Sequence, residues 1–294
     1  MRLLITGGSG YLGRHLVRRA AAEYPGSFAY TTFSTDPLGL PQGAAQGAAL
    51  DLRDGAAVAR FVTDFAPDAV IHTAGSNTTP DMAAVIVEGT RHVVAAAAAV
   101  GARLVHLSTD SVFDGAHAPY DETAVPAPLN EYGRAKAAAE AIVAAHPDAV
   151  IVRTSLIYGL EEMDKGTAWM AAALREGRPV TLFTNQRRNP VWVETLGAAC
   201  LALAQRSASP ASDYRGILNV AGRQVMARAE FGLRMLEWWG VVVRATLSPA
   251  PDESGRWPLD CTMDLSRAEV LLPVTLWGVD EVLARAVRGG LSLP

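Results

Sequence analysis

The first half of the chain alternates short apolar runs with longer segments of helical periodicity. The apolar runs predict strands at Leu3–Thr6, Phe28–Phe33, Ala69–Ala74, Arg103–Ser108 and Ala149–Thr154, with a weaker one near Ala48–Leu50. The intervening segments predict helices at about 12–23, 56–66, 82–100 and 131–145. Strands that are apolar throughout and alternate with helices are typical of a parallel sheet covered on both faces. The sequence therefore predicts an α/β fold with a doubly wound parallel sheet, whose ligands gather at the carboxyl ends of its strands.

The pattern loosens after about residue 160, where proline and glycine interrupt the apolar runs. Helices are expected near 167–176, 194–206, 228–239 and 279–288. We expect a Rossmann domain over residues 1–160. Residues 161–294 should form a smaller α/β region that mainly binds substrate, with part of it returning to pack on the first domain.

Composition narrows the function classes. The chain has 294 residues, a formal net charge of −4 and a pI of about 5.9, so neither nucleic acid nor an anionic membrane is an expected partner. No run of eighteen apolar residues predicts a membrane-spanning helix, and no signal peptide precedes the first strand. Cys200 and Cys261 lack metal-ligand spacing, so we expect no metal site and reduced thiols in a cytoplasmic protein.

The stretch "TGGSGYLG" joins the first strand to the first helix. Gly7, Gly10 and Gly13 have the spacing that permits a tight turn, a close approach to a pyrophosphate and close helix–strand packing. The N–H groups of a helix that begins at Tyr11 and Leu12 favour bound phosphate. An ordinary glycine-rich turn is the alternative, but the position between strand and helix favours a dinucleotide site. The ends of two later strands, at Ala74, Gly75 and Ser108, are expected to border the same cofactor.

The second strand indicates which dinucleotide is preferred. Its sequence, "FAYTTFST", has no acidic residue before Asp36 to bind the adenosine ribose, so a 2′-phosphate would not be repelled. Arg14 is a candidate partner for that phosphate, or else a solvated helix residue. The sequence therefore favours NADP modestly over NAD. Asp51 and Leu52, which follow the third strand, are expected to contact the adenine.

Tyr132 and Lys136 lie four residues apart on a predicted helix and share one face. An ammonium beside a phenol would lower the pKa of Tyr132, so the tyrosine could exchange a proton with a carbonyl or hydroxyl. The lysine is notable because only two of the 26 basic residues are lysines, Lys136 and Lys165. Thr109, after a central strand, is expected to donate a hydrogen bond to a substrate oxygen. A turn that caps its own backbone is the alternative for Thr109.

Together these segments resemble the extended short-chain dehydrogenase/reductase family over essentially the whole chain. The resemblance rests on "TGGSGYLG", "DLRD", "STDSVFDG", "PLNEYGRAK" and "VRTSLIYG". The phrases "LSTDSVFDG" and "APLNEYGRAK" are closest to the dTDP-4-dehydrorhamnose reductase branch, and "RRNPVWVETLG" and "RWPLDCTMDLSRAEVL" support it. The resemblance implies catalysis by Thr109, Tyr132 and Lys136, with NAD(P)H as the reductant. The implied reaction is reduction of a 4-keto group on a nucleotide-linked deoxysugar, for which a homodimer would be in keeping with the family.

Three departures from the family pattern concern the substrate. Ile86 stands where the family usually has an asparagine, the segment before that helix is short, and Ser111 replaces a tyrosine that often touches the sugar. Ser111, Trp192 and Arg256 are the expected substrate-binding residues, Arg256 for the diphosphate. Two alternatives remain open. One is an epimerase or dehydratase on the same scaffold, and the other is a non-catalytic NADP-binding regulatory subunit like that of methionine adenosyltransferase.

Overall fold

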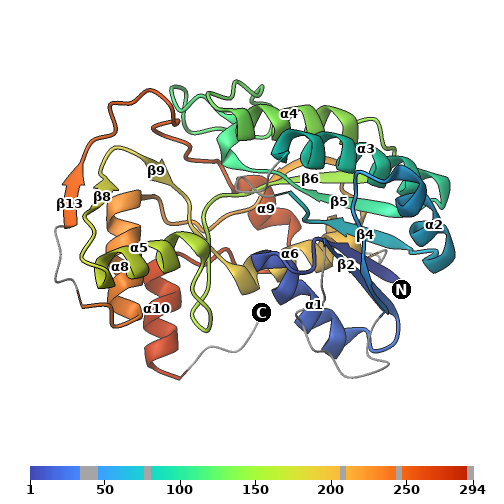
Figure 1. Cartoon of the computed structure of the whole chain (residues 1–294), viewed down its shortest axis with the longest axis horizontal. Coiled ribbons are helices and arrows are strands. Elements are labelled where there is room, and N and C mark those ends of the chain that lie inside the picture. The colour runs from blue at the N-terminus through green and yellow to red at the C-terminus, as the bar shows by residue number, and fades with distance from the viewer. Residues whose placement is uncertain (34–45, 76–80, 206–209, 243–246, 290–294) are drawn as a thin grey trace.

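The computed structural model describes residues 1–33, 46–75, 81–205, 210–242 and 247–289. A seven-stranded sheet forms the larger part of the molecule, with strand order β11-β6-β5-β4-β1-β2-β3 (Figure 1). All of its neighbouring strands pair in parallel, for example Leu3 of β1 with Phe28 of β2 and with Ala69 of β4. This is the doubly wound α/β fold that the strand–helix alternation predicts.

The elements of the first half have the following bounds: β1 Leu3–Thr6, α1 Tyr11–Glu23, β2 Phe28–Thr32, β3 Gln46–Ala49, α2 Gly55–Phe65, β4 Ala69–His72, α3 Met82–Ala99, β5 Arg103–Leu107, the 3-10 turn η1 Asp110–Val112, α4 Glu131–Val143 and β6 Ala149–Arg153. The second half contains β7 Ile157–Tyr158, α5 Lys165–Arg175, β8 Val180–Phe183, β9 Arg187–Arg188, β10 Val191–Trp192, α6 Val193–Ala204, α7 Pro210–Asp213, β11 Gly216–Asn219, β12 Met226–Ala227, α8 Arg228–Trp238, β13 Leu247–Ala250, α9 Ser266–Leu271 and α10 Val279–Val287.

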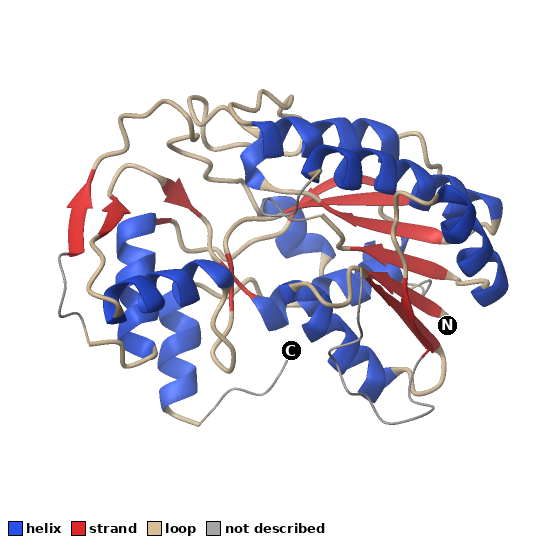
Figure 2. Cartoon of the chain, viewed as in Figure 1, coloured by secondary structure: helices blue, strands red, loops and turns tan. Residues whose placement is uncertain are grey.

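Helices cover both faces of the sheet, and its central strands are therefore buried along their whole length. In Figures 1 and 2, α2, α3 and α4 lie on one face and α1 and α6 on the other. The two later elements α6 and β11 belong to this larger part of the molecule. Strand β11 pairs with β6, Gly216 opposite Val150, and becomes the seventh strand.

Helix α7 packs on α6 and α9 packs on β11, so both also belong to the larger part. The elements α5, α8, α10, β8 and β13 lie beyond the carboxyl ends of the strands, on the left in Figure 1. Here α5, α8 and α10 stand beside β8 and β13, which pair in parallel. A separate apolar cluster holds this part together and includes Leu174, Leu182 and Leu236. The carboxyl edge of the sheet, where β1, β4, β5 and β6 end, therefore faces this smaller part.

Predicted and observed bounds agree within a few residues for the first-half elements, whereas none of the strands β7 to β13 is among the predicted elements. Of the described residues, α3 alone has the length and apolar composition of a membrane-spanning helix, and a third of it is buried. In the fold it packs beside α2 and α4 on the sheet (Figure 1). A helix that covers a sheet can have the same length and apolar composition as a membrane-spanning helix, so these two properties are weak evidence for a membrane span.

Candidate active site and cofactor cleft

The glycine loop follows β1 directly and turns into α1. Gly7 has a φ of 76°, which residues other than glycine rarely adopt. A Cβ on Gly13 would lie 2.1 Å from the Gly7 carbonyl oxygen, so only glycine lets α1 approach the loop this closely. The N-cap residue Gly10 offers no side-chain hydrogen bond, and the first turn of α1 contains no acidic residue. This helix start is therefore suited to an anion.

A cavity of about 240 Å³, which we call the glycine-loop cavity, opens beside this turn. Its lining is Gly7, Ser9, Gly10, Thr31, Thr32, Phe33, Leu50, Asp51, Leu52, Thr73, Ala74, Gly75, Val85 and Lys165. Six of the predicted cofactor contacts meet there, since the lining contains Gly7, Gly10, Asp51, Leu52 and, just after β4, Ala74 and Gly75. A long, backbone-rich cleft at the carboxyl edge of a parallel sheet fits a dinucleotide.

The adenosine end of this cleft lacks an acid on β2, whose last residues in the cavity are Thr31 and Thr32. Asp36 lies outside the described residues. Asp51 lies across the cavity and pairs with Arg53 at 2.7 Å, which lowers the pKa of the Asp51 carboxyl. The charge of the Asp51 carboxylate is balanced by Arg53, so this end of the cavity can accept a 2′-phosphate as well as a ribose hydroxyl.

Three other predicted cofactor residues occupy different positions. Leu12 is 6% exposed and belongs to the main core. Arg14 forms an ion pair with Glu162 and donates to the Ser9 carbonyl at 2.8 Å, so its guanidinium ties the glycine loop to the second half of the chain. The Tyr11 hydroxyl donates to the Glu162 carbonyl at 2.7 Å. The sequence offered no sign of these contacts, because Glu162 is about 150 residues away from Tyr11 and Arg14 in the chain.

The predicted catalytic residues meet at the carboxyl end of β5. Thr109 follows β5, and α4 carries Tyr132 and Lys136 across to it. Asn130 caps α4 by accepting a hydrogen bond from the Gly133 N–H at 2.9 Å. Gly133 is required for the close approach, since a Cβ there would lie 2.2 Å from the Ser111 carbonyl oxygen. Backbone contact thus positions the helix that bears the tyrosine and the lysine.

Lys136 is 3% exposed and points at the end of β5. Its Nζ donates to the Leu107 carbonyl and lies 3.4 Å from Nε2 of His106. Burial lowers the pKa of Lys136 to about 8, although the carboxylate of Glu140 opposes the shift. Burial, followed by the charge of Lys136, also holds the pKa of His106 well below its usual value, which keeps the imidazole neutral. His106 is therefore a neutral neighbour of the ammonium, a contact that its sequence position did not indicate.

The pKa of Tyr132 moves in the direction opposite to the sequence-based expectation. Burial raises it to about 12, and the nearby carboxylate of Asp110 adds to the rise, while a hydrogen bond with Thr109 lowers it. Lys136 has no lowering influence here because its ammonium is directed at the Leu107 carbonyl and His106. The phenol therefore keeps its proton throughout the neutral pH range, as a proton donor must.

Asp110 is the residue of this site that sequence reasoning undervalued. Its carboxylate accepts from Ser155 at 2.6 Å and lies 3.4 Å from Nε of Arg188, and the Asp110 and Arg188 side chains are nearly buried. The backbone N–H of Ser111 donates to Thr109 Oγ1 at 3.2 Å, so the turn after β5 also caps itself. Thr109 can therefore cap this turn and also be a residue of the site. Arg188 connects the end of β5 to the second half of the chain.

A second cavity, of about 640 Å³, lies between α5, β8 and α8 next to this turn, and we call it the α5–α8 cavity. Its lining is Tyr11, Ser155, Leu156, Ile157, Asp164, Lys165, Gly166, Thr167, Trp169, Met170, Pro179, Thr181, Leu182, Phe183, Arg228, Phe231 and Gly232. Burial, and then the charge of Arg188, lowers the pKa of the Arg228 guanidinium, which donates to the amide oxygen of Gln186 at 3.2 Å. A half-buried guanidinium that lines a cavity favours an anionic ligand.

The predicted substrate residues Trp192 and Arg256 are not in that lining. Trp192 is 4% exposed in the main core, where β10 pairs with β7. Arg256 lies on an exposed loop, and its backbone N–H donates to Ser254 Oγ. Trp169 and Arg228 occupy the cavity instead. Trp169 is one of the tryptophans that the sequence offers as pocket candidates, whereas Arg228 lies outside every motif used in the sequence analysis.

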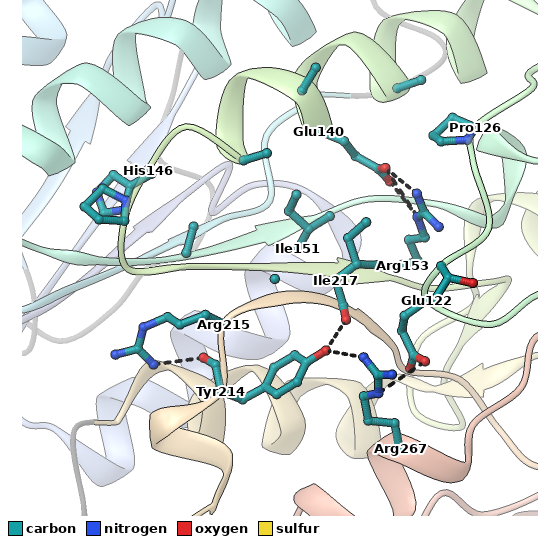
Figure 3. Close-up of a pocket in the computed structure, with 17 residues that line it drawn as sticks. Glu122, Pro126, Glu140, His146, Ile151, Arg153, Tyr214, Arg215, Ile217 and Arg267 are labelled. Carbon is teal, nitrogen blue, oxygen red and sulfur yellow. Dashed lines mark hydrogen bonds and ion pairs between the residues drawn. The ribbon is translucent and has the colours of Figure 1, made fainter.

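A further cavity, of about 810 Å³, lies beneath α4 at the β11 edge (Figure 3). Its ion pairs are internal: Arg153 with Glu140 at 2.8 Å, and Arg267 with Glu122 at 3.6 Å. Glu140 also accepts from Ser108, so the Ser108 hydroxyl faces α4. Over the described part of the chain, no three His, Cys, Asp or Glu side chains are grouped so as to hold a metal ion.

Comparisons with known proteins agree with this geometry. Residues 1–287 match the family described as RmlD substrate binding domain. A dTDP-4-dehydrorhamnose reductase of Mycobacterium tuberculosis is 35% identical over 242 residues, which cover 77% of this chain and 72% of that protein. Methionine adenosyltransferase 2 subunit beta of Xenopus laevis is 29% identical over 263 residues, covering 86% and 76%. The crystal structure of a hypothetical dTDP-4-dehydrorhamnose reductase from Sulfolobus tokodaii superposes with a TM-score of 0.78 at 28% identity, covering 96% of this chain and 98% of that one.

Proposed function

We propose that this chain, which belongs to the family described as RmlD substrate binding domain, is an NAD(P)H-dependent reductase of a nucleotide-sugar 4-ketone. The observation that carries the proposal is the meeting of Thr109, Tyr132 and Lys136 at the end of β5. The neighbouring residue Asp110 accepts a hydrogen bond from Ser155, which lines the α5–α8 cavity. A related protein that is 35% identical is a dTDP-4-dehydrorhamnose reductase.

The glycine loop and the strand ends around it would hold the dinucleotide. Gly7, Gly10 and the uncapped start of α1 suit the pyrophosphate, and Asp51 and Leu52 suit the adenosine. When bound, the reduced nicotinamide supplies the hydride, and the protein's own task is to bind, orient and protonate.

Tyr132 is the proton donor in this proposal. Its raised pKa keeps the phenol protonated, so the hydroxyl is ready to give a proton to the ketone oxygen. Thr109 bonds the same phenol and adds a second hydroxyl beside that oxygen. Lys136, fixed by the Leu107 carbonyl, keeps a positive charge one helical turn from Tyr132 below about pH 8.

The α5–α8 cavity would take the nucleotide part of the substrate. Arg228 offers a half-buried guanidinium for a diphosphate, and Trp169 offers a flat apolar surface for a base. A nucleotide sugar is thus the small-molecule partner in the proposal. We further place the protein in the cytoplasm, in keeping with the buried thiols Cys200 and Cys261, and expect a homodimer from the family resemblance.

A second candidate is a non-catalytic NADP-binding subunit. The methionine adenosyltransferase relative supports it, as does Ile86, which is 1% exposed and packs with Tyr132 in a small apolar cluster. An isoleucine there provides no polar group for relaying a proton. The intact Thr109, Tyr132 and Lys136 favour the reductase.

The decisive experiment follows oxidation of NADPH and, separately, NADH with a dTDP-4-keto-6-deoxy sugar as substrate. Turnover by the wild type and loss of at least about 100-fold in Tyr132→Phe are expected, because general acid catalysis contributes about 100- to 10,000-fold. Cofactor affinity should change little in this variant, and binding is measured in parallel by titration.

Tyr158→Phe is the matched control. Tyr158 is fully buried, and its hydroxyl has no hydrogen-bond partner among the described residues. The variant removes an oxygen outside the site and should therefore retain turnover. Tight NADPH binding without any turnover by the wild type would exclude the 4-keto-sugar reductase and favour the subunit.

A further inference from the structure

Lys165 is the lysine that neither the sequence motifs nor the proposed catalysis uses. It is one of only two lysines among 26 basic residues. It is the first residue of α5, and its neighbour Asp164 caps that helix through the N–H groups of Gly166 and Thr167 at 2.9 and 3.0 Å. The cap belongs to Asp164, so the lysine side chain is not needed to begin the helix.

Lys165 alone among the described residues lines both cavities. In the glycine-loop cavity it is the one cationic side chain of the described lining, opposite the loop residues Gly7, Ser9 and Gly10. In the α5–α8 cavity it accompanies Arg228. One side chain therefore borders the sites of two ligands that each contain a diphosphate.

Contacts independent of Lys165 hold it in this position. The 159–165 segment is fastened to the first turn of α1, because Tyr11 donates to the Glu162 carbonyl at 2.7 Å and Arg14 pairs with the Glu162 carboxylate. The backbone at Gly159 lies close to Tyr11 as well, since a Cβ there would be 2.5 Å from the Tyr11 hydroxyl oxygen. These contacts hold the start of α5 beside the glycine loop, where Lys165 borders the cavity.

Lysine chemistry suits such a position. Its ammonium is a compact charge with three donors on a flexible stem, whereas the planar guanidinium of arginine binds one fixed pair of oxygens best. Resting on the proposed function, we propose that Lys165 is a phosphate-binding residue shared by the two cavities. It binds the cofactor pyrophosphate on one side and the substrate diphosphate on the other.

The test measures binding rather than turnover. NADPH, NADH and dTDP are titrated separately by calorimetry into the wild type and into Lys165→Gln. We expect the Kd of each ligand to rise about 10-fold in the variant, the effect of losing one charge-assisted hydrogen bond to phosphate. Arg175→Gln, at the other end of α5, removes the same charge from a residue that lines neither cavity. Its three Kd values should stay within about 2-fold of the wild type, as expected for an exposed charge away from the ligands.

The pattern of losses decides the proposal. Unchanged Kd values for all three ligands in Lys165→Gln would overturn it, and a loss for dTDP alone or for the dinucleotides alone would refute the sharing. A loss for NADPH but not for NADH would move the contact to the 2′-phosphate and refute the pyrophosphate assignment. A wild type that binds neither dinucleotide would instead refute the proposed function, so the two failures are distinguishable.

Discussion

The two cavities that share Lys165 in their linings are built in different ways. The glycine-loop cavity, about 240 Å³, is lined by glycines and small side chains at strand ends. The α5–α8 cavity, about 640 Å³, is lined by large side chains such as Trp169, Phe183 and Arg228 that come from separate elements. The first cavity depends on how closely backbones approach one another, and the second depends on which side chains project into it.

The difference explains why cofactor contacts are readable in a sequence and substrate contacts are not. A backbone site needs glycines at fixed spacing in one continuous stretch, because a Cβ would collide with the neighbouring chain. A side-chain site can be assembled from many residue types at distant positions. Variants should therefore separate into changes that disturb backbone packing and changes that remove one ligand contact.

The largest effect is expected from breaking the ion pair that holds the catalytic helix. Glu140 lies one turn after Lys136 on α4 and binds Arg153, and the two side chains are 5% and 0% exposed. Glu140→Gln leaves the Arg153 charge uncompensated, so the free energy of unfolding should fall by about 3–5 kcal/mol. Urea unfolding measures the loss.

The control for that variant is Glu176→Gln. Glu176 pairs with Arg178 on the surface, where the two side chains are 59% and 50% exposed, so the change should cost less than about 1 kcal/mol. Equal losses in the two variants would contradict a role for burial.

The next effect concerns the catalytic helix backbone. In Gly133→Ala the new Cβ would lie 2.2 Å from the Ser111 carbonyl oxygen, so α4 must shift and move Tyr132 away from Thr109. We expect kcat to fall about 100-fold, the scale of a misplacement of about 1 Å at a catalytic site. Steady-state kinetics checks this expectation.

Gly197→Ala provides the matched control, since Gly197 also lies in a helix and its nearest neighbour to an added Cβ is Leu16 at 3.9 Å. This variant should keep its activity and gain about 0.5–1 kcal/mol of stability, because alanine loses less backbone entropy than glycine in a helix. A comparable loss of kcat in both variants would refute the steric argument.

A smaller effect is expected in the side-chain site. Arg228→Gln removes a half-buried cation from the α5–α8 cavity, so KM for the nucleotide sugar should rise about 10-fold while the Kd of NADPH stays constant. Kinetics and cofactor titration on the same preparation separate the two quantities. A parallel rise in the Kd of NADPH would show that the two cavities do not differ in the proposed way.

The smallest effect is a change in pH dependence. Burial lowers the pKa of Lys136 to about 8, so its charge is present below that pH and is lost above it, whereas Tyr132, with a pKa of about 12, stays protonated. The value of kcat/KM should be constant below about pH 8 and fall as pH rises further. Lys136→Arg keeps its charge, so its lower activity should lack this break. A break at the same pH in both proteins would assign it to another group.

Most of the first-half fold could be predicted from the sequence. Apolar runs such as Leu3–Thr6 and Ala69–His72 form strands because each is buried on both faces of a parallel sheet, and that burial leaves a continuous pattern. The two-residue strands β7, β9, β10 and β12 leave none. Their pairing depends on neighbours that are distant in the chain, as Trp192 opposite Tyr158 shows.

The sequence by itself determined the elements that depend on local chemistry. These are the alternation of strands and helices, the glycine loop before α1, and the i,i+4 pair Tyr132 and Lys136 on α4. Each arises from spacing within one continuous segment.

Only the tertiary structure decided what these elements meet. It directed Arg14 to Glu162, buried Trp192 in the core, raised the pKa of Tyr132 and brought Arg228 and Lys165 to the site. The physical reason is that burial, charge proximity and cavity shape depend on atoms from segments far apart in the chain, and no local pattern encodes those distances.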